Sequence, residues 1–298
     1  MKVGLMRQMA LFQYSSWKKD KIVNVASVPQ RSPFRYPGGK TWLVPQVRQW
    51  LSTKKKRPVE FIEAFAGGAI IGLTVAFEQL AEHVLLVELD QDVASVWQTI
   101  LGGEGKWLAK RISSFELTQG NVEKLLSTTP RDLRERGFQT ILRNRVCHGG
   151  ILAPGAGLIK NGENGKGIKS RWYPETLKKR ILNIVAIKNQ VAFVQGDGME
   201  IIREKRNCTD TVFFIDPPYT AGGKRAGTRL YTHFDLDHEE LFKIISKVKG
   251  DFLLTYDNSE EIRDMARRHK FEVREIAMKG THHTKMHELL ISRDLGWL

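Results

Sequence analysis

The stretch Val212-Phe213-Phe214-Ile215-Asp216-Pro217-Pro218-Tyr219 joins a short apolar run to an Asp-Pro-Pro-Tyr turn. A short apolar run bounded by turn residues is typical of a strand buried on both faces. Two consecutive prolines cannot extend a hydrogen-bonded ladder, so the strand should end where they begin. The turn would therefore present an aspartate and a tyrosine just past the carboxyl end of a buried strand, where open α/β sheets bind their ligands.

Six further runs along the chain have strand character, and helix-length segments separate most of them. They are Val59–Phe65, His83–Leu89, Val191–Gln195, Phe252–Tyr256, Phe271–Ile276 and Glu288–Ile291. Behind the first run, apolar residues recur at helical spacing, at Ile70, Leu73, Phe77 and Leu80. This alternation predicts an α/β, Rossmann-like fold with a seven-stranded, mainly parallel sheet and helices on both faces.

One interval interrupts the alternation, because residues 101–189 contain no clear strand. Thr129-Pro130 is typical of a helix start, so we expect a helix from there to about Arg145. Residues 149–167 are rich in glycine, which indicates a long irregular loop. We therefore divide the chain into an N-terminal arm (1–30), a core (31–100 and 190–298) and an inserted, mostly helical subdomain (101–189).

Basic residues outnumber acidic ones, 47 to 33, and give a formal net charge of +14. Such a surplus favours a polyanionic partner such as a nucleic acid. Two stretches concentrate it: the glycine-rich loop region and the segment after the Asp-Pro-Pro-Tyr turn, which has no acid from 220 to 234. A solvated, mobile surface is the alternative. We expect backbone contacts from Lys160, Lys166, Lys169, Arg171, Lys224, Arg225 and Arg229.

Several classes of site and location are disfavoured. The two cysteines lie far apart, which excludes a zinc cluster or disulfide framework and fits a reducing cytoplasm. No apolar run approaches the ~20 residues of a membrane span, and no apolar stretch follows the basic N-terminus as in a signal peptide. Gly39-Lys40-Thr41 resembles a P-loop, but Phe34 stands where that motif requires glycine. We expect no metal.

Two further features accompany the first two predicted strands. Glu63-Ala64-Phe65-Ala66-Gly67-Gly68 joins the first strand to its helix, and small residues there let a ligand approach the backbone at a helix N-terminus. Glu88 ends the second strand, where an acid can accept both hydroxyls of a ribose. An ordinary α/β turn and a surface carboxylate are the alternatives for each feature taken alone.

In their order, these segments resemble the Dam-type DNA adenine methyltransferases (D12 class, alpha arrangement). The order is Phe34-Arg35-Tyr36-Pro37-Gly38-Gly39-Lys40, then the Glu63–Gly68 turn, Glu88, a long insertion, Gly196-Asp197 and the Asp-Pro-Pro-Tyr turn. The resemblance covers the chain from about Phe34 to about Ser292. It implies an S-adenosylmethionine (SAM)-dependent methyltransferase fold whose insertion recognises the target. The implied reaction moves a methyl group to N6 of an adenine flipped out of duplex DNA at a specific site.

The resemblance also implies roles for single residues. Cofactor contacts would come from Tyr36, Lys40, Phe65, Ala66, Gly67, Gly68, Glu88, Asp197 and Asp216. Lys40 would lie near the SAM carboxylate, Glu88 on the ribose and Asp197 at the cofactor's adenine. Asp216, Pro217 and Tyr219 would hold the target base. Members of the family often have other residues directly before Gly38-Gly39-Lys40, and they often have Asp in place of Glu88. Both differences keep the chemistry.

Three alternatives stay open at this point. They are an N4-cytosine methyltransferase of the same architecture, an RNA adenine methyltransferase, and a catalytically inactive DNA-binding regulator that kept the fold. For the favoured function we expect double-stranded DNA as partner, no membrane contact, a monomer in solution and a cytoplasmic location near the nucleoid. The sequence leaves open a cognate restriction or defence partner, and it does not predict the recognition sequence.

Overall fold

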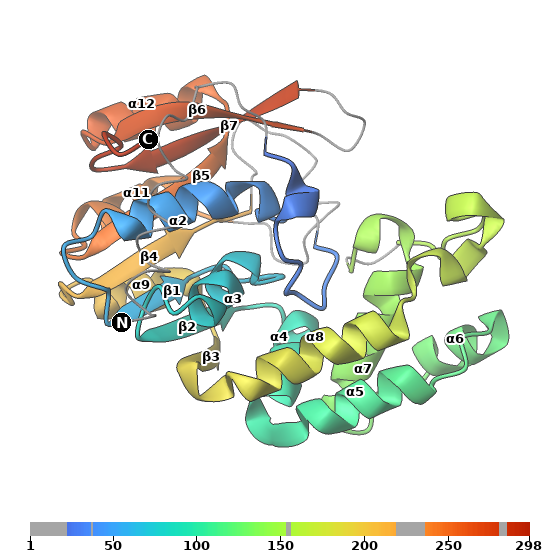
Figure 1. The fold of residues 1–298 in the computed structure, drawn as a ribbon. Helices are drawn as coiled ribbons and strands as arrows, with labels where there is room; N and C mark the ends of the chain where they lie inside the picture. Colours follow the sequence, from blue (N-terminus) through green and yellow to red (C-terminus); the bar gives the residue numbers. More distant parts are fainter. Residues whose placement is uncertain (1–22, 37, 153–155, 219–235, 280–284) are drawn as a thin grey trace.

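A computed structural model describes residues 23–36, 38–152, 156–218, 236–279 and 285–298. Four residues with expected roles lie outside these ranges: Tyr219, Lys224, Arg225 and Arg229. The described chain forms a central sheet with helices on both faces, and a group of helices extends from one side (Figure 1).

All seven predicted strands form, in one sheet with the order β3-β2-β1-β4-β5-β7-β6. Their bounds are β1 Glu60–Glu63, β2 His83–Glu88, β3 Val191–Gln195, β4 Thr211–Ile215, β5 Asp251–Asp257, β6 Glu272–Lys279 and β7 Lys285–Ser292. The strands β1 to β5 pair in parallel. The last strand, β7, pairs antiparallel with both β5 and β6. The prediction of a seven-stranded, mainly parallel sheet is confirmed.

Alternate strand residues pack against two different helical layers. Ile62, Leu85 and Phe213 belong to one buried apolar cluster, with residues of α9 (Gly198–Lys205), α11 (His238–Ser246) and α12 (Glu260–Arg268). Phe61 and Phe214 belong to the other, with α2 (Val44–Ser52), α3 (Ile70–Phe77) and α4 (Gln91–Thr99). Each fully buried Phe or Leu side chain contributes about 1.5–3 kcal/mol. The apolar runs therefore become strands because both faces of the sheet are covered.

The strand order reverses between β1 and β4. From β1 the chain proceeds outward through β2 to β3, whereas β4 and β5 lie on the other side of β1. The connections that leave β1 and β4 therefore diverge at their carboxyl ends and open a crevice between them. This crevice is the expected ligand site of an open parallel sheet.

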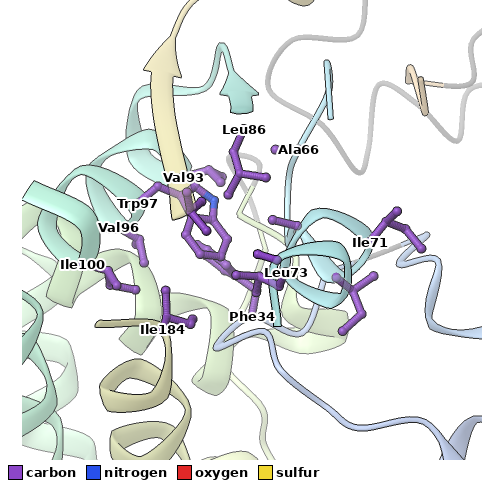
Figure 2. Close-up of a cluster of buried hydrophobic side chains, with 14 of the residues drawn as sticks. Phe34, Ala66, Ile71, Leu73, Leu86, Val93, Val96, Trp97, Ile100 and Ile184 are labelled. Atoms are coloured by element: carbon purple, nitrogen blue, oxygen red, sulfur yellow. The ribbon is translucent and has the colours of Figure 1, made fainter. Parts of the chain in front are cut away.

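The insertion contributes four helices: α5 (Gly105–Ser114), α6 (Gln119–Leu126), α7 (Leu133–Val146) and α8 (Pro174–Ala186). In its described part, a single β-bridge pairs Cys147 with Leu158, and no β-strand forms. It packs onto the core through α7 against α4, and α5 packs against α8. Figure 2 shows Trp97 of α4 surrounded by core residues, with Ile184 of α8 nearby in the same cluster. One apolar cluster therefore runs from the sheet into the insertion.

The expected start of the insertion's central helix at Thr129-Pro130 is wrong. Helix α7 begins at Leu133, and the Asp132 side chain accepts a hydrogen bond from the Glu135 N–H as its N-cap. Pro130 lies before the cap. An aspartate that satisfies an otherwise unpaired helix N–H places the boundary more strongly than a proline does.

Candidate active site

A pocket of about 840 Å³ opens at the carboxyl ends of β1, β2 and β4. The structure brings nine sequence-predicted residues together around it: Tyr36, Lys40, Phe65, Ala66, Gly67, Gly68, Glu88, Asp197 and Asp216. Pro218 also lines the pocket, whereas Pro217 is buried and is not among the lining residues. Segments distant in the sequence thus meet in one crevice.

The glycine turn after β1 is held from both sides. Gly67 has a positive φ of 47°, which favours glycine, and a Cβ there would lie 2.6 Å from the Tyr36 ring. A Cβ on Gly68 would lie 2.9 Å from the Cβ of Tyr36. From beneath, the buried Trp97 indole N–H donates to the Gly67 carbonyl at 2.9 Å. The glycines are therefore required because Tyr36 packs directly onto their backbone.

Glu88 links the ends of β2 and β1. Its carboxylate accepts hydrogen bonds from the Gly67 N–H at 2.8 Å and the Asp90 N–H at 2.9 Å. Burial outweighs these two bonds and raises the pKa of Glu88 to about 7. Each carboxylate oxygen can accept more than one hydrogen bond, so the group can still receive ribose hydroxyls.

Lys40 lies in the pocket wall with 3% of its surface exposed. Its ammonium lies 2.9 Å from the Asp216 Oδ1 and 3.4 Å from the Glu288 Oε2, and it donates to the Gly38 carbonyl at 2.9 Å. An ammonium has three N–H donors, and these three oxygens can accept all of them. A SAM carboxylate that contacted Lys40, as the sequence predicted, would therefore compete with these three oxygens for the N–H donors of the ammonium.

Asp216 is positioned by the neighbouring strand as well as by Lys40. The buried Thr255 hydroxyl on β5 donates to the Asp216 Oδ1 at 2.6 Å. The backbone of Asp216 follows β4, whose five residues are all buried. One carboxylate oxygen is thus oriented by a hydroxyl and an ammonium at the mouth of a rigid strand.

Asp197 follows β3 and caps α9, because its side chain accepts from the Met199 N–H at 2.8 Å. A Cβ on Gly198 would lie 2.0 Å from the Ala64 carbonyl oxygen, so only glycine fits. This close approach brings the Asp197 turn beside the end of β1.

Sequence reasoning missed several residues of this site. Glu63 ends β1 and lines the pocket; it accepts from the Gly72 N–H at 2.7 Å at the N-terminus of α3, and burial raises its pKa well above the usual range. Glu63 ends its strand as Glu88 ends the next one, a parallel that was available in the sequence. Thr255 and Glu288 carried no comparable signal, because strand pairing alone places them beside Asp216 and Lys40.

The insertion also holds the segment that carries Tyr36. The fully buried Asn144 of α7 accepts from the Arg35 N–H at 2.8 Å and donates to the Arg35 carbonyl at 3.0 Å and the Gly150 carbonyl at 2.7 Å. Two further residues, which the sequence did not place at this pocket, donate to carbonyls of the same segment: Arg145 to Pro33 and Arg180 to Ser32. The pocket wall is therefore built jointly by the core and the insertion.

The four expected DNA contacts that the structure describes do not lie at the pocket. Lys160, Lys166 and Lys169 are exposed and Arg171 is half-buried, and none of the four lines the pocket. In the described chain, no helix is long and apolar enough to cross a membrane. Nor do the described side chains form a group of three or more metal-ligating residues.

Comparisons with known proteins show the family of this chain. Residues 36–279 match the model of the D12 class N6 adenine-specific DNA methyltransferases. The chain is 23% identical over 289 residues to the DNA N-6-adenine-methyltransferase of Escherichia phage P1, covering 91% of this chain and 36% of that protein. It thus spans about a third of the length of that relative.

Solved structures with a loosely similar fold include two methyltransferases. One is the putative methyltransferase YhhF of Escherichia coli, with 12% identity, 85% of this chain and 86% of that chain covered, and a TM-score of 0.36. The other is a methyltransferase of Geobacter sulfurreducens, with 11% identity, 98% and 89% covered, and a TM-score of 0.37. The family model, which matches most of the residues, is decisive: this chain belongs to the D12 class N6 adenine-specific DNA methyltransferase family.

Proposed function

We propose that this protein transfers a methyl group from SAM to the exocyclic N6 of an adenine flipped out of duplex DNA. The observation that carries the proposal is the placement of Asp216. Its carboxylate lies in the pocket wall, oriented by Thr255 and Lys40, and is followed by Pro217 and the pocket-lining Pro218.

The residues around the pocket fit SAM. The pocket volume of about 840 Å³ lies within the range of sites that bind small molecules and cofactors. Five acidic residues line the core side, which suits a cofactor that carries a sulfonium and an ammonium: Glu63, Glu88, Asp90, Asp197 and Asp216. In this arrangement Glu88 accepts the ribose hydroxyls, the Gly67-Gly68 turn supports the methionine end and Asp197 lies at the adenine end.

Asp216 would activate the nucleophile. The N6 lone pair of adenine is delocalised into its ring, so the amine attacks poorly without help. Hydrogen bonds from N6–H to the Asp216 carboxylate and the Pro217 carbonyl would favour a more tetrahedral nitrogen whose lone pair points at the methyl carbon. SAM, when bound, supplies a methyl group on a sulfonium that needs no acid to leave. A new C–N bond replaces the C–S bond, and N6 then releases one proton to water.

Lys40 and Thr255 would keep Asp216 fixed during this step. Positioning of reacting groups supplies a large part of the barrier reduction in such transfers. A carboxylate already oriented by a hydroxyl and an ammonium needs little reorganisation when the amine arrives. Flipping the base costs a few kcal/mol, and stacking on Tyr219 would offset part of it.

We further propose that the insertion selects the methylated sequence. A SAM pocket needs only the crevice above the strands, whereas residues 101–189 add helices and a glycine-rich loop. Asn161 and Asn164 are exposed there and can read base edges, as can the half-buried Arg171. An alanine scan across 161–173 should change the methylated motif. If the motif never changes, specificity lies elsewhere, and the segment 221–233 is the next candidate.

The proposed reaction is tested by base-resolved methylation. The purified chain, SAM and mixed-sequence duplex DNA should yield N6-methyladenine, and the Asp216→Ala variant should yield none. N4-methylcytosine as the product would show an enzyme of the same architecture with another target. Methylation of structured RNA in preference to duplex DNA would contradict the assigned substrate. SAM binding without any product would indicate a regulator that kept the fold.

A further inference from the structure

The insertion supplies a cationic wall to the active-site pocket. Arg145 of α7 and Arg180 of α8 both line the pocket that contains Asp216 and Glu88. Arg145 is 4% exposed, and Arg180 is half-buried. Neither was expected from the sequence to line this pocket.

The two guanidinium groups are held by backbone carbonyls and have no acidic partner. Arg145 donates to the Pro33 carbonyl, and the Arg180 Nη1 donates to the Ser32 carbonyl at 2.9 Å. The buried Nε of Arg145 makes no hydrogen bond. Among the side chains that the structure describes, no carboxylate forms an ion pair with either arginine.

This arrangement is costly in the absence of an anion. Burial of a charge costs several kcal/mol unless an opposite charge compensates it. Burial, together with the positive charges of Arg180 and Arg35, lowers the pKa of Arg145 to about 9. The exposed Arg35 also lines the pocket and adds a third positive charge. A mobile anion that entered here would satisfy both the charge and the orphaned donor.

The charge of the wall selects among the anions that could reach it. SAM carries one carboxylate but a net positive charge, because its sulfonium and ammonium groups outweigh it. Arg145 and Arg180, which form no ion pair with a described carboxylate, therefore disfavour SAM as the occupant of this wall, whereas the carboxylates of the core side favour it. A phosphodiester has no positive charge of its own, and guanidinium groups match its oxygens as two-pronged donors.

We propose that Arg145 and Arg180, with Arg35 at the rim, form a phosphate site that holds the DNA backbone beside the flipped adenine. This inference rests on the proposed function, since it requires duplex DNA at the pocket. Within that function, it assigns the strongest backbone contact to the pocket wall and not to the exposed lysines of the glycine-rich loop.

The test compares Arg180→Gln with the wild-type chain in binding a short mixed-sequence duplex. Affinity should fall about tenfold for one lost charge-assisted contact. Between about 50 and 200 mM salt, the slope of log affinity against log salt should become shallower by about 0.9. Arg180→Lys keeps the charge and should retain the slope while losing part of the affinity. Arg180 also holds the Ser32 carbonyl of the segment that carries Tyr36, so SAM affinity, measured by calorimetry, should fall by no more than about fivefold in both variants.

Two further variants accompany this test: a control away from the pocket and a second probe of the proposed phosphate site. Lys247→Gln removes an exposed positive charge near the amino end of β5, away from the pocket, and should behave as wild type. Arg35→Gln alters an exposed side chain and should flatten the salt dependence even if Arg180→Gln proves too unstable to assay.

Two results would overturn the inference. Unchanged duplex affinity and slope in Arg180→Gln and Arg35→Gln would mean that the arginines only hold the segment 32–35. A loss of SAM affinity greater than about fivefold, with an unchanged DNA slope, would identify the SAM carboxylate as the occupant. Failure of the proposed function looks different, because the wild-type chain itself would then neither bind duplex DNA nor methylate it.

Discussion

Two buried cations line the same pocket, and their surroundings differ. Lys40, 3% exposed, has carboxylate oxygens of Asp216 and Glu288 within 3.4 Å of its ammonium. Arg145, 4% exposed, has backbone carbonyls and other arginines around it. We refer to these as the Lys40 corner and the Arg145 corner.

The difference shows which interactions the fold completes by itself. In the Lys40 corner, charge is balanced within the protein, so the groups that activate the amine are in place before any substrate binds. In the Arg145 corner, no carboxylate of the described residues pairs with Arg145 or Arg180, which is tolerable where a substrate supplies the negative charge. Preorganisation for chemistry and attraction of the polyanion thus occupy separate walls of one pocket.

The largest expected effect comes from the carboxylate of the Lys40 corner. Asp216→Ala should reduce methyl transfer by more than about tenfold in kcat, a loss above ~1.4 kcal/mol, because the amine loses its acceptor. Duplex binding should be largely retained, since Asp216 is an anion and contacts no phosphate. Single-turnover transfer of a labelled methyl group measures the first, and fluorescence anisotropy the second. Asp264→Ala, at an exposed position of α12, is the control.

Replacing the cation of the same corner separates two roles for Lys40. Lys40→Met should lower kcat by about tenfold or more, because Asp216 loses an oriented partner, while the Kd for SAM changes less. The sequence-based assignment predicts the reverse, a weaker SAM complex through loss of a carboxylate contact worth ~1.5–3 kcal/mol. Steady-state kinetics and calorimetry on one preparation decide between them. The melting temperature of Lys40→Met should also fall, because the buried Glu288 and the partly buried Asp216 lose their counter-charge.

Glu88 tests the cofactor side of the pocket, between the two corners. Glu88→Gln should weaken SAM binding by ~1.5–3 kcal/mol, because a charge-assisted acceptor of the ribose hydroxyls is lost. Calorimetric titration with SAM measures this change. Glu82→Gln, at an exposed carboxylate before β2, should leave the affinity unchanged. Equal SAM affinity in the wild type and Glu88→Gln would contradict the position assigned to the ribose.

The raised pKa of Glu88 adds a pH dependence with a definite sign. Its pKa of about 7 means that the carboxyl is mostly protonated below neutral pH and ionised above it. The ionised form accepts hydroxyl donors better, so SAM affinity should rise as pH increases through 7. The unfolded group ionises near its usual pKa, so this residue's contribution to stability is lost as pH rises towards 7. Glu88→Gln should flatten both curves.

A smaller effect should follow from loosening the link between the insertion and the core. Asn144→Ala removes three hydrogen bonds that hold Arg35 and Gly150, and so releases the segment that places Tyr36 on Gly67-Gly68. SAM affinity should fall about fivefold, on the order of 1 kcal/mol, because Tyr36 is then held less firmly in the pocket. Asn121→Ala, exposed on α6 of the same insertion, is the control. Unchanged SAM affinity would show that Tyr36 keeps its place without α7.

The smallest effect is expected from the exposed lysines of the glycine-rich loop, each taken singly. Lys166→Ala should weaken binding by about twofold to threefold for all duplexes alike, because an exposed contact acts mainly through counterion release. Replacing Lys160, Lys166 and Lys169 together should flatten the salt dependence without altering the methylated motif. An effect of Lys166→Ala larger than that of Arg180→Gln would reverse the ranking of loop and pocket wall.

Much of the core was predictable because its signals are local. Most strands contain a short apolar run, and a strand buried on both faces has this sequence pattern whichever elements pack against it. Glu88, Asp197 and Asp216 follow such runs directly, so their meeting at one sheet edge could be expected once the strands were taken to be parallel. The start of α7 was missed because two local signals competed and the cap at Asp132 prevailed.

The partners in the two corners were not predictable in the same way. Lys40 looks alike in sequence whether it meets a cofactor or Asp216, and Arg35 and Asn144 are 109 residues apart. Hydrophobic period and turn chemistry act over a few residues, so the sequence determines strands, turns and the edge where ligands gather. The pairing of buried charges depends on which elements pack together and on what they exclude from water. That packing, which no local pattern predicts, places two carboxylates beside Lys40. Among the described residues, it places no carboxylate in an ion pair with Arg145.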